Sequence, residues 1–155
     1  MDSKKHKLMI GCGDVSKKEK NTIYLDLIPF KNVDIVRDIE QGLPFDNNKF
    51  DEIQAIHIME HMKDLIFVMN ECHRVLKKDG TLIVEVPTGR NARIDPNHVR
   101  FLDEYSMDFF LYRDFNSITS GVRGWYSMEG MFYMGITEKE PKGRGLRFVM
   151  KKKGD

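Results

Sequence analysis

The amino-acid sequence predicts a single α/β domain over residues 1–155, with a mostly parallel sheet, flanking helices and an antiparallel hairpin at its end. Three observations lead to this prediction. Short apolar runs with strand character recur along the chain, and a segment with helical spacing of apolar residues lies between two of them. Two later strand-like runs are joined by a turn that contains glycine and proline. Strands that alternate with helices form parallel sheets, whereas strands joined by a turn pair antiparallel.

The apolar runs that predict parallel strands lie at 7–10, 23–26, 33–38, 50–56 and 81–87. The segment 14–20, which joins the first two runs, is polar and has almost no residues suited to a core. Parallel strands usually need a crossover of about a dozen residues or more, commonly a helix. We therefore expect the first crossover helix to be shortened or missing, and one face of the sheet to be thinly covered.

The clearest helix begins near residue 65, and apolar residues recur at the i, i+3, i+4 and i+7 positions of one face from Leu65 to Leu76. Arg74, Lys77 and Lys78 suit the negative end of this helix, and Gly80 follows its expected end. The remaining segments predict a loop over 88–100, a helix over 103–115, and hairpin strands over 131–137 and 146–150.

The overall composition argues against several classes of protein. A net charge of +1 lacks the basic excess that a broad nucleic-acid surface requires. No apolar run has the length of a membrane span, and no apolar signal segment follows the first residues, so we expect a cytoplasmic protein without membrane contact. Cys12 and Cys72 are expected to be reduced thiols rather than a disulfide.

Glycines and acids follow three successive strands. The first apolar run ends in Gly11-Cys12-Gly13, the second in Asp26 and the third in Asp38. Glycine lacks a Cβ, so this loop can turn sharply and lie close to a ligand. In an open parallel sheet, ligands bind at the carboxyl ends of the strands, where the strand order reverses. Because an acid after the second strand suits the hydroxyls of a ribose, these residues predict a crevice for a nucleoside.

The order of these motifs resembles the class I S-adenosylmethionine-dependent methyltransferases, in particular a small branch similar to methyltransferase type 11. The matching segments are 10–13, Asp26, 36–39, 43–45, 50–53, Glu60-His61 and 74–82. The resemblance covers roughly residues 7–101. It implies a Rossmann-like fold, in which the final strand pair is similar to the hairpin that closes the family's seven-stranded sheet.

The resemblance also implies S-adenosylmethionine as the cofactor. It places at the cofactor Gly11, Cys12, Gly13, Asp26, Leu27, Asp38, Ile39 and His57. In that arrangement the two glycines approach the amino-acid part of the cofactor, and Asp26 accepts the ribose hydroxyls. Asp38 accepts the adenine amino group, and the Ile39 amide lies beside the ring.

The methyl acceptor is not identified by any motif, and a small molecule or a saccharide is expected. The resemblance places His57 near the transferred methyl group, so His57 and His98 are the candidate general bases. His98 has an equally weighted structural alternative, a loop histidine hydrogen-bonded to the backbone. Trp125 and Tyr126 would stack on an acceptor ring or pack against the sheet.

Other functions remain alternatives. His57-Ile58-Met59-Glu60-His61 matches the H-x-x-E-H pattern of some zinc hydrolases. Such enzymes need both histidines on one helical face, but His57 directly follows a strand, and no spacing singles out a third ligand, so we expect no metal site. A nicotinamide dehydrogenase is disfavoured because Ser16 stands where the third glycine of G-x-G-x-x-G is required.

A further alternative is a catalytically silent binding subunit that keeps the methyltransferase fold. The missing crossover helix removes a part that normally covers the cofactor. We therefore expect that a second copy of the chain, or another protein subunit, completes the thinly covered sheet face.

Overall fold

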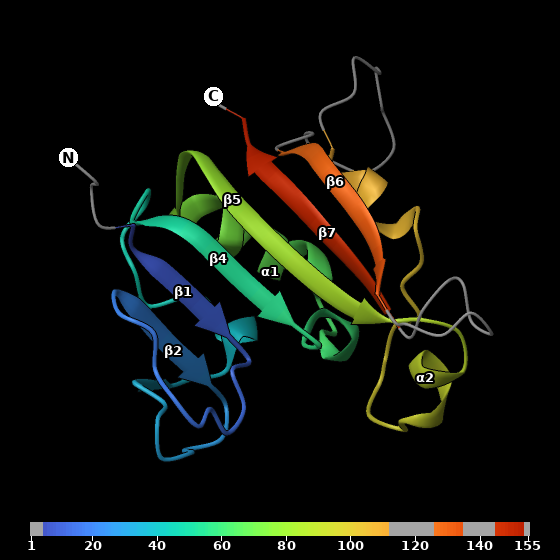
Figure 1. The fold of residues 1–155 in the computed structure, drawn as a ribbon, viewed down its shortest axis with the longest axis horizontal. Helices are drawn as coiled ribbons and strands as arrows, with labels where there is room; N and C mark the ends of the chain where they lie inside the picture. Colours follow the sequence, from blue (N-terminus) through green and yellow to red (C-terminus); the bar gives the residue numbers. More distant parts are fainter. Residues whose placement is uncertain (1–4, 112–125, 135–144, 154–155) are drawn as a thin grey trace.

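The computed structural model describes residues 5–111, 126–134 and 145–153. Seven strands form one sheet in the order β3-β2-β1-β4-β5-β7-β6 (Figure 1). The strands are β1 (Lys7–Ile10), β2 (Thr22–Asp26), β3 (Ile35–Val36), β4 (Phe50–Ile56), β5 (Leu76–Pro87), β6 (Tyr126–Met134) and β7 (Gly145–Lys152). Neighbours from β3 to β5 are parallel, and β7 is antiparallel to both β5 and β6. The predicted α/β sheet with a terminal hairpin is confirmed.

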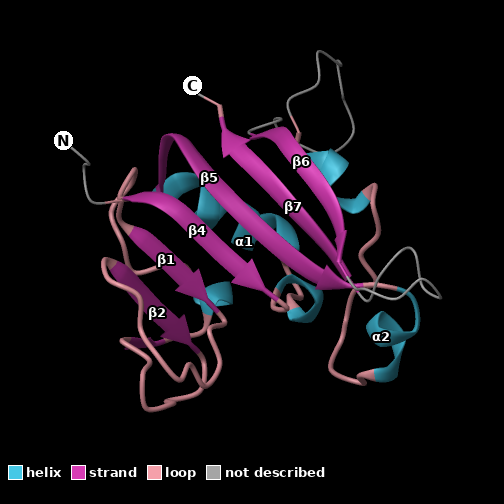
Figure 2. Cartoon of the chain, viewed as in Figure 1, coloured by secondary structure: helices cyan, strands magenta, loops and turns pink. Residues whose placement is uncertain are grey.

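In the part of the chain that the structure describes, two α-helices and three short 3₁₀ helices accompany the sheet. They are α1 (Leu65–Val75), α2 (Gly89–Ile94), η1 (Ile39–Gln41), η2 (Met59–His61) and η3 (Ser106–Phe110). Helix α1 packs behind β4 and β5, and no described helix crosses the opposite face of the sheet, which faces the viewer in Figure 2. Residues 14–21 contain no helix, so the first crossover is a loop as predicted.

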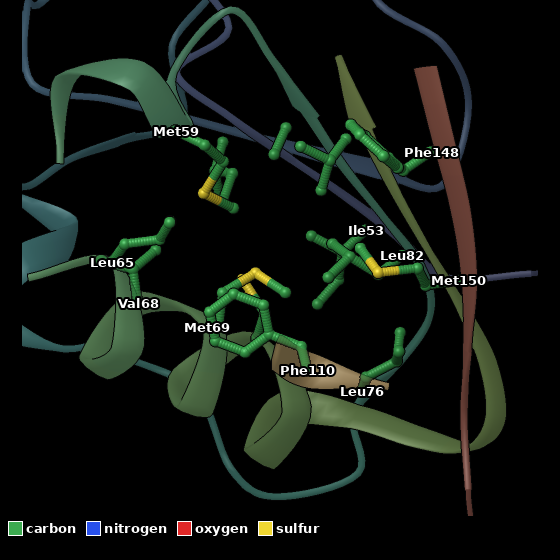
Figure 3. Close-up of a cluster of buried hydrophobic side chains, with 14 of the residues drawn as sticks. Ile53, Met59, Leu65, Val68, Met69, Leu76, Leu82, Phe110, Phe148 and Met150 are labelled. Carbon is green, nitrogen blue, oxygen red and sulfur yellow. The ribbon is translucent and has the colours of Figure 1, made fainter. Parts of the chain in front are cut away.

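Helix α1 forms because its sequence supplies both a cap and an apolar face. The Asp64 carboxylate accepts a hydrogen bond from the Phe67 amide at 2.9 Å, which satisfies one free donor of the first turn. The buried residues of α1 are Leu65, Val68, Met69, Cys72 and Val75. They contact a core that includes Ile53, Leu82 and Phe148 from the sheet (Figure 3).

The helix ends at Val75, before the predicted last turn with Lys77 and Lys78, and these two basic residues lie in a strand instead. Leu76 adopts extended backbone and pairs with Phe50, so it begins β5. Lys77 therefore lies in a strand, where its ammonium group contacts both oxygens of Asp51 at 2.9 Å. Pairing with the neighbouring strand overrides the helical propensity of this segment.

Arg74 instead holds the loop that leads into β4. Its guanidinium group binds both carboxylate oxygens of Glu71, at 2.7 and 2.8 Å. It also donates to the carbonyls of Leu43 and Phe45, at 2.9 and 2.7 Å. The hydrogen bonds from Arg74 lower the pKa of Glu71. The Leu-Pro-Phe segment is thus fixed to α1 through charged hydrogen bonds, which are stronger than neutral ones.

Other predicted boundaries were wrong. The expected helix over 103–115 is only the 3₁₀ helix η3 in its described part, and residues 112–115 lie outside the described residues. The expected loop over 88–100 contains α2. Strand β3 has two residues, and β6 begins at Tyr126 rather than at Met131.

Tyr126 settles one of the open alternatives. Its side chain is fully buried, and its hydroxyl donates to the Met69 carbonyl of α1 at 3.1 Å. Tyr126 therefore packs against the helix instead of facing an acceptor, whereas Trp125 lies outside the described residues. In the described part of the chain, no helix is long and apolar enough to cross a membrane.

Candidate cofactor site at the strand ends

The glycine loop lies where β1, β2 and β4 end, along one edge of the sheet (Figure 1). Gly11 and Gly13 have φ angles of 62° and 63°, which favour glycine. The Gly11 amide donates to the Leu25 carbonyl at 2.9 Å, so the loop is tied to β2. A Cβ on Gly13 would meet no atom within 4 Å, whereas a Cβ on Gly11 would lie 2.6 Å from Ile58. The loop is therefore packed on one side and open at Gly13.

Asp26, the last residue of β2, is the second element of this site. Its carboxylate accepts the Gly13 amide through Oδ2 at 2.8 Å and the Ile28 amide through Oδ1 at 2.9 Å. The residue is 9% exposed, so these bonds hold the carboxylate in one orientation. An ionised carboxylate has about four acceptor positions, so each oxygen can accept one further hydrogen bond.

Asp38 and Ile39 follow β3 and form the third element. Asp38 caps η1 by accepting the Glu40 amide through Oδ1 at 2.9 Å. The Ile39 side chain is buried, so only its backbone is available to a ligand. The Asp26 carbonyl accepts the Arg37 amide at 2.8 Å, which links the ends of β2 and β3.

Three exposed apolar side chains accompany these acids. Leu27, Ile28 and Val36 are 66%, 53% and 54% exposed. Leu27 was predicted from the sequence, whereas Ile28 and Val36 were not. Their signal in the sequence is an apolar residue next to an acid at the end of a strand. Such exposed apolar residues beside fixed carboxylates suit a ligand with both an apolar ring and hydroxyl groups.

Neither cysteine has the features of an activated nucleophile. Burial raises the pKa of the Cys12 thiol, and the Asp26 carboxylate raises it further. Burial raises the pKa of Cys72 to about 12. Because the thiolate is the reactive form, a raised pKa argues against an activated thiol at either position. Cys12 is therefore a small residue of the glycine loop.

His57 stands at the end of β4 with a φ angle of 52°, a conformation that few residues other than glycine adopt. Its amide donates to the Glu85 carbonyl at 2.9 Å, which holds this backbone in place. The ring is about half exposed, and its Nδ1 lies 3.7 Å from Oε1 of Glu60. Backbone strain of this kind is often found at functional sites.

His98, the other predicted base, lies in a different environment. Its ring is 8% exposed, and Nδ1 lies 2.8 Å from the Ala92 carbonyl. This is the backbone hydrogen bond that the structural alternative required. Its Nε2 lies 3.9 Å from Oε1 of Glu60. His98, Glu60 and His61 therefore form a cluster beside the end of β4.

The zinc hydrolase arrangement, which the sequence disfavours, is not formed among the described residues. His57 and His61 are separated by the end of β4 and a 3₁₀ turn instead of sharing one helical face. Among the described residues, the group of side chains able to hold a metal ion contains Glu60, His61 and His98, without His57. Sequence reasoning did not find this group because His98 is distant in the sequence and reaches Glu60 only through the folded loop.

Comparisons with known proteins identify the fold. A family model described as a methyltransferase domain matches residues 14–84. An uncharacterised protein of Methanocaldococcus jannaschii is 35% identical over 98 residues, which cover 55% of this chain and 43% of that protein. The chain thus spans less than half of the length of this curated relative.

Solved structures agree with the family model. One similar chain comes from the complex between the Haloferax volcanii Trm112 methyltransferase activator and a methyltransferase, with a TM-score of 0.70, 14% identity, and coverage of 97% of this chain and 83% of that one. A SAM-dependent methyltransferase of Archaeoglobus fulgidus has a TM-score of 0.66 and 15% identity, with 96% and 86% coverage. The resemblance to class I S-adenosylmethionine-dependent methyltransferases is confirmed, and this chain has their fold, with residues 14–84 matching the methyltransferase domain.

Proposed function

We propose that this chain binds S-adenosylmethionine and transfers its methyl group to an acceptor. The observation that carries this proposal is the open space at Gly13, directly beside the fixed carboxylate of Asp26. A nucleoside with two free hydroxyls matches the remaining acceptor positions of Asp26. The methyltransferase-domain match of residues 14–84 supports the same assignment.

Residues at the ends of β1, β2 and β3 would contact different parts of the cofactor. Asp26 accepts the ribose hydroxyls, and Asp38, which donates no hydrogen bond when ionised, accepts the adenine amino group. Leu27 supplies an apolar surface for the ring. Gly11, Cys12 and Gly13 allow the backbone to approach the amino-acid part of the cofactor.

The protein's contribution to methyl transfer is chiefly orientation. Bound S-adenosylmethionine supplies an electrophilic methyl group on its sulfonium. The residues around the site hold the acceptor in line and exclude water. His57 is better placed than His98 to take a proton from an acceptor, because its ring is half exposed whereas that of His98 is almost fully buried. The acceptor is a small molecule or a saccharide in this proposal.

Titration calorimetry with S-adenosylmethionine and S-adenosylhomocysteine tests the proposal. We expect one equivalent of either ligand to bind per chain, and adenine alone to bind more weakly because it lacks the ribose and amino-acid groups. Absence of binding by both ligands would contradict the proposal. Binding without turnover on any acceptor would favour the silent binding subunit, which keeps the site but not the reaction.

We also propose that a second copy of the chain covers the open face of the sheet. A row of neighbouring side chains crosses this face on four strands, made of Met9, Gln54, Ile83 and Val149. Ile83 is buried, and the other three are half-buried. The Haloferax volcanii complex supports the view that this fold can work with a partner, and another subunit is the alternative occupant.

Light scattering after size-exclusion chromatography tests the second copy. We expect a molar mass above the 18.2 kDa of one chain, and a lower mass for Val149→Lys. Ile66→Lys is the matched control, because Ile66 is exposed on α1, at the other face of the sheet. A wild-type mass of one chain would exclude the dimer.

A further inference from the structure

We propose that Glu60, His61 and His98 form a binding site for a divalent transition-metal ion. One ligand atom from each of these side chains lies within 4.8 Å of the other two. Atoms bound to a common metal ion at about 2.0–2.2 Å lie at most about 4.4 Å apart, so small side-chain movements suffice to close the site. This proposal does not depend on methyl transfer, because it rests on a different group of residues.

The two histidines already have the hydrogen bonds that metal ligands usually make. Nδ1 of His98 lies 2.8 Å from the Ala92 carbonyl, and Nδ1 of His61 lies 3.1 Å from the Asn97 carbonyl. A carbonyl only accepts, so Nδ1 carries the proton in both rings. With one proton on Nδ1, a ring offers the lone pair of Nε2 to a metal, and the backbone carbonyl fixes the orientation of the ring.

The carboxylate of Glu60 supplies an independent observation. Glu60 is 2% exposed, and its Oε2 is buried without a hydrogen-bond partner in the described structure. A buried carboxylate oxygen without a partner is costly, and buried charges are normally paired or bound to metal. The nearest cationic candidates are histidine nitrogens at 3.7 and 3.9 Å from Oε1, beyond hydrogen-bond distance. A metal ion would satisfy the buried carboxylate.

The backbone holds the three ligands together before any ion binds. The Glu60 carbonyl accepts the amides of Val99 and Arg100, at 3.0 and 3.1 Å. The Arg100 side chain donates to the carbonyls of Met62, at 2.7 Å, and Lys63. The residues that follow His98 are thus hydrogen-bonded to η2 and to the two residues after it. Arg100 therefore links the segment after His98 to the residues that follow η2.

The ligand set selects the class of metal. Imidazole nitrogen suits zinc, iron, nickel and copper, whereas magnesium and calcium prefer oxygen ligands. Two histidines and one carboxylate leave at least one coordination position open, as in sites where a metal binds water or a substrate oxygen. Nδ1 of His57 lies 3.7 Å from Oε1 of Glu60, so an ion bound by Glu60 would be close to the end of β4.

Zn²⁺ and Co²⁺ binding to the metal-free chain, after removal of any histidine tag, tests the site. We expect one Zn²⁺ per chain by calorimetry, visible absorption from bound Co²⁺, and no comparable binding of Mg²⁺. Each of Glu60→Gln, His61→Ala and His98→Ala should weaken Zn²⁺ binding by at least about tenfold, the lower end of the loss seen even for outer partners of metal ligands. His6→Ala, at an exposed histidine outside the cluster, should bind as the wild type does.

Thermal unfolding separates metal binding from a purely structural role. Zn²⁺ should raise the melting temperature of the wild type, because a ligand that binds the folded state stabilises it. In the presence of a chelator, the melting temperature of Glu60→Gln should be no lower than that of the wild type, since the substitution removes a buried charge. Added Zn²⁺ should no longer raise the melting temperature of this variant. If His98→Ala does not fold, Glu60→Gln and His61→Ala still decide. Wild-type binding below one ion per chain, or equal affinity in these variants, would overturn the proposal.

Discussion

Replacing Asp26 by alanine is expected to weaken S-adenosylhomocysteine binding at least about 100-fold and to lower the free energy of unfolding by about 1–3 kcal/mol. The loss of affinity follows from two ribose hydroxyls that lose a charged acceptor, each hydrogen bond of this kind contributing about 1.5–3 kcal/mol. The loss of stability follows because the amides of Gly13 and Ile28 lose their acceptor as well. Calorimetry and urea unfolding measure the two effects separately.

Asp34→Ala is the matched control for this variant. Asp34 also accepts a backbone amide, that of Tyr24 at 2.9 Å, and contacts Lys18, whereas the amide of Gly13 is bound by Asp26. Its loss should lower stability without changing the affinity for S-adenosylhomocysteine. An unchanged affinity in Asp26→Ala, with the chain folded, would contradict the proposed ribose contact.

Alanine at Gly11 is expected to affect mainly the stability of the protein, and alanine at Gly13 mainly the binding of the ligand. Both positions have nearly the same positive φ, so each substitution costs about 1–2 kcal/mol in backbone strain. At Gly11 the added Cβ would lie 2.8 Å from the Cβ of Ile58, which a rotamer change cannot relieve. Overpacking of this kind costs about 1–3 kcal/mol more, so Gly11→Ala should be the less stable of the two variants.

Gly13→Ala should instead impair the ligand. Its Cβ meets no atom within 4 Å, so the protein itself can accommodate the methyl group. That methyl would occupy the open space proposed for the cofactor, and the affinity for S-adenosylhomocysteine should fall while stability falls only by the cost of strain. Urea unfolding and calorimetry on both variants provide the comparison. Equal losses of stability would show that Ile58 moves aside, and an unchanged affinity in Gly13→Ala would place the ligand elsewhere.

The sheet was predictable because most of its strands have a local sequence signal, a short apolar run bounded by turn residues. Strand β4 has the predicted bounds, since the run from Phe50 to Ile56 is apolar on its buried side and enclosed by turns. The location of the glycine loop and of the two acids at the strand ends was also predictable. The carboxyl ends of parallel strands meet at one edge of the sheet. The end of α1 was not predictable from the local sequence. Leu76 pairs with Phe50, a residue distant in the sequence, and therefore belongs to β5.

Within the candidate sites, the residues could be named from the sequence more readily than their contacts. Asp26 was assigned to a ligand, but its support of the Gly13 amide depends on how the loop returns over β2. The approach of His98 to Glu60 depends on backbone hydrogen bonds from the neighbouring Val99 and Arg100 amides. Contacts of this type arise between segments distant in sequence, and no periodic pattern reports them.

The brevity of β3 affects how copies of this chain can associate. It is an edge strand of the sheet and has only two residues, Ile35 and Val36. An edge strand this short offers few free amides and carbonyls to a strand from another molecule. Natural proteins use short edge strands to prevent edge-to-edge aggregation. Continuation of the sheet from one molecule into the next is therefore disfavoured on that side, and the proposed second copy on the open face does not require it.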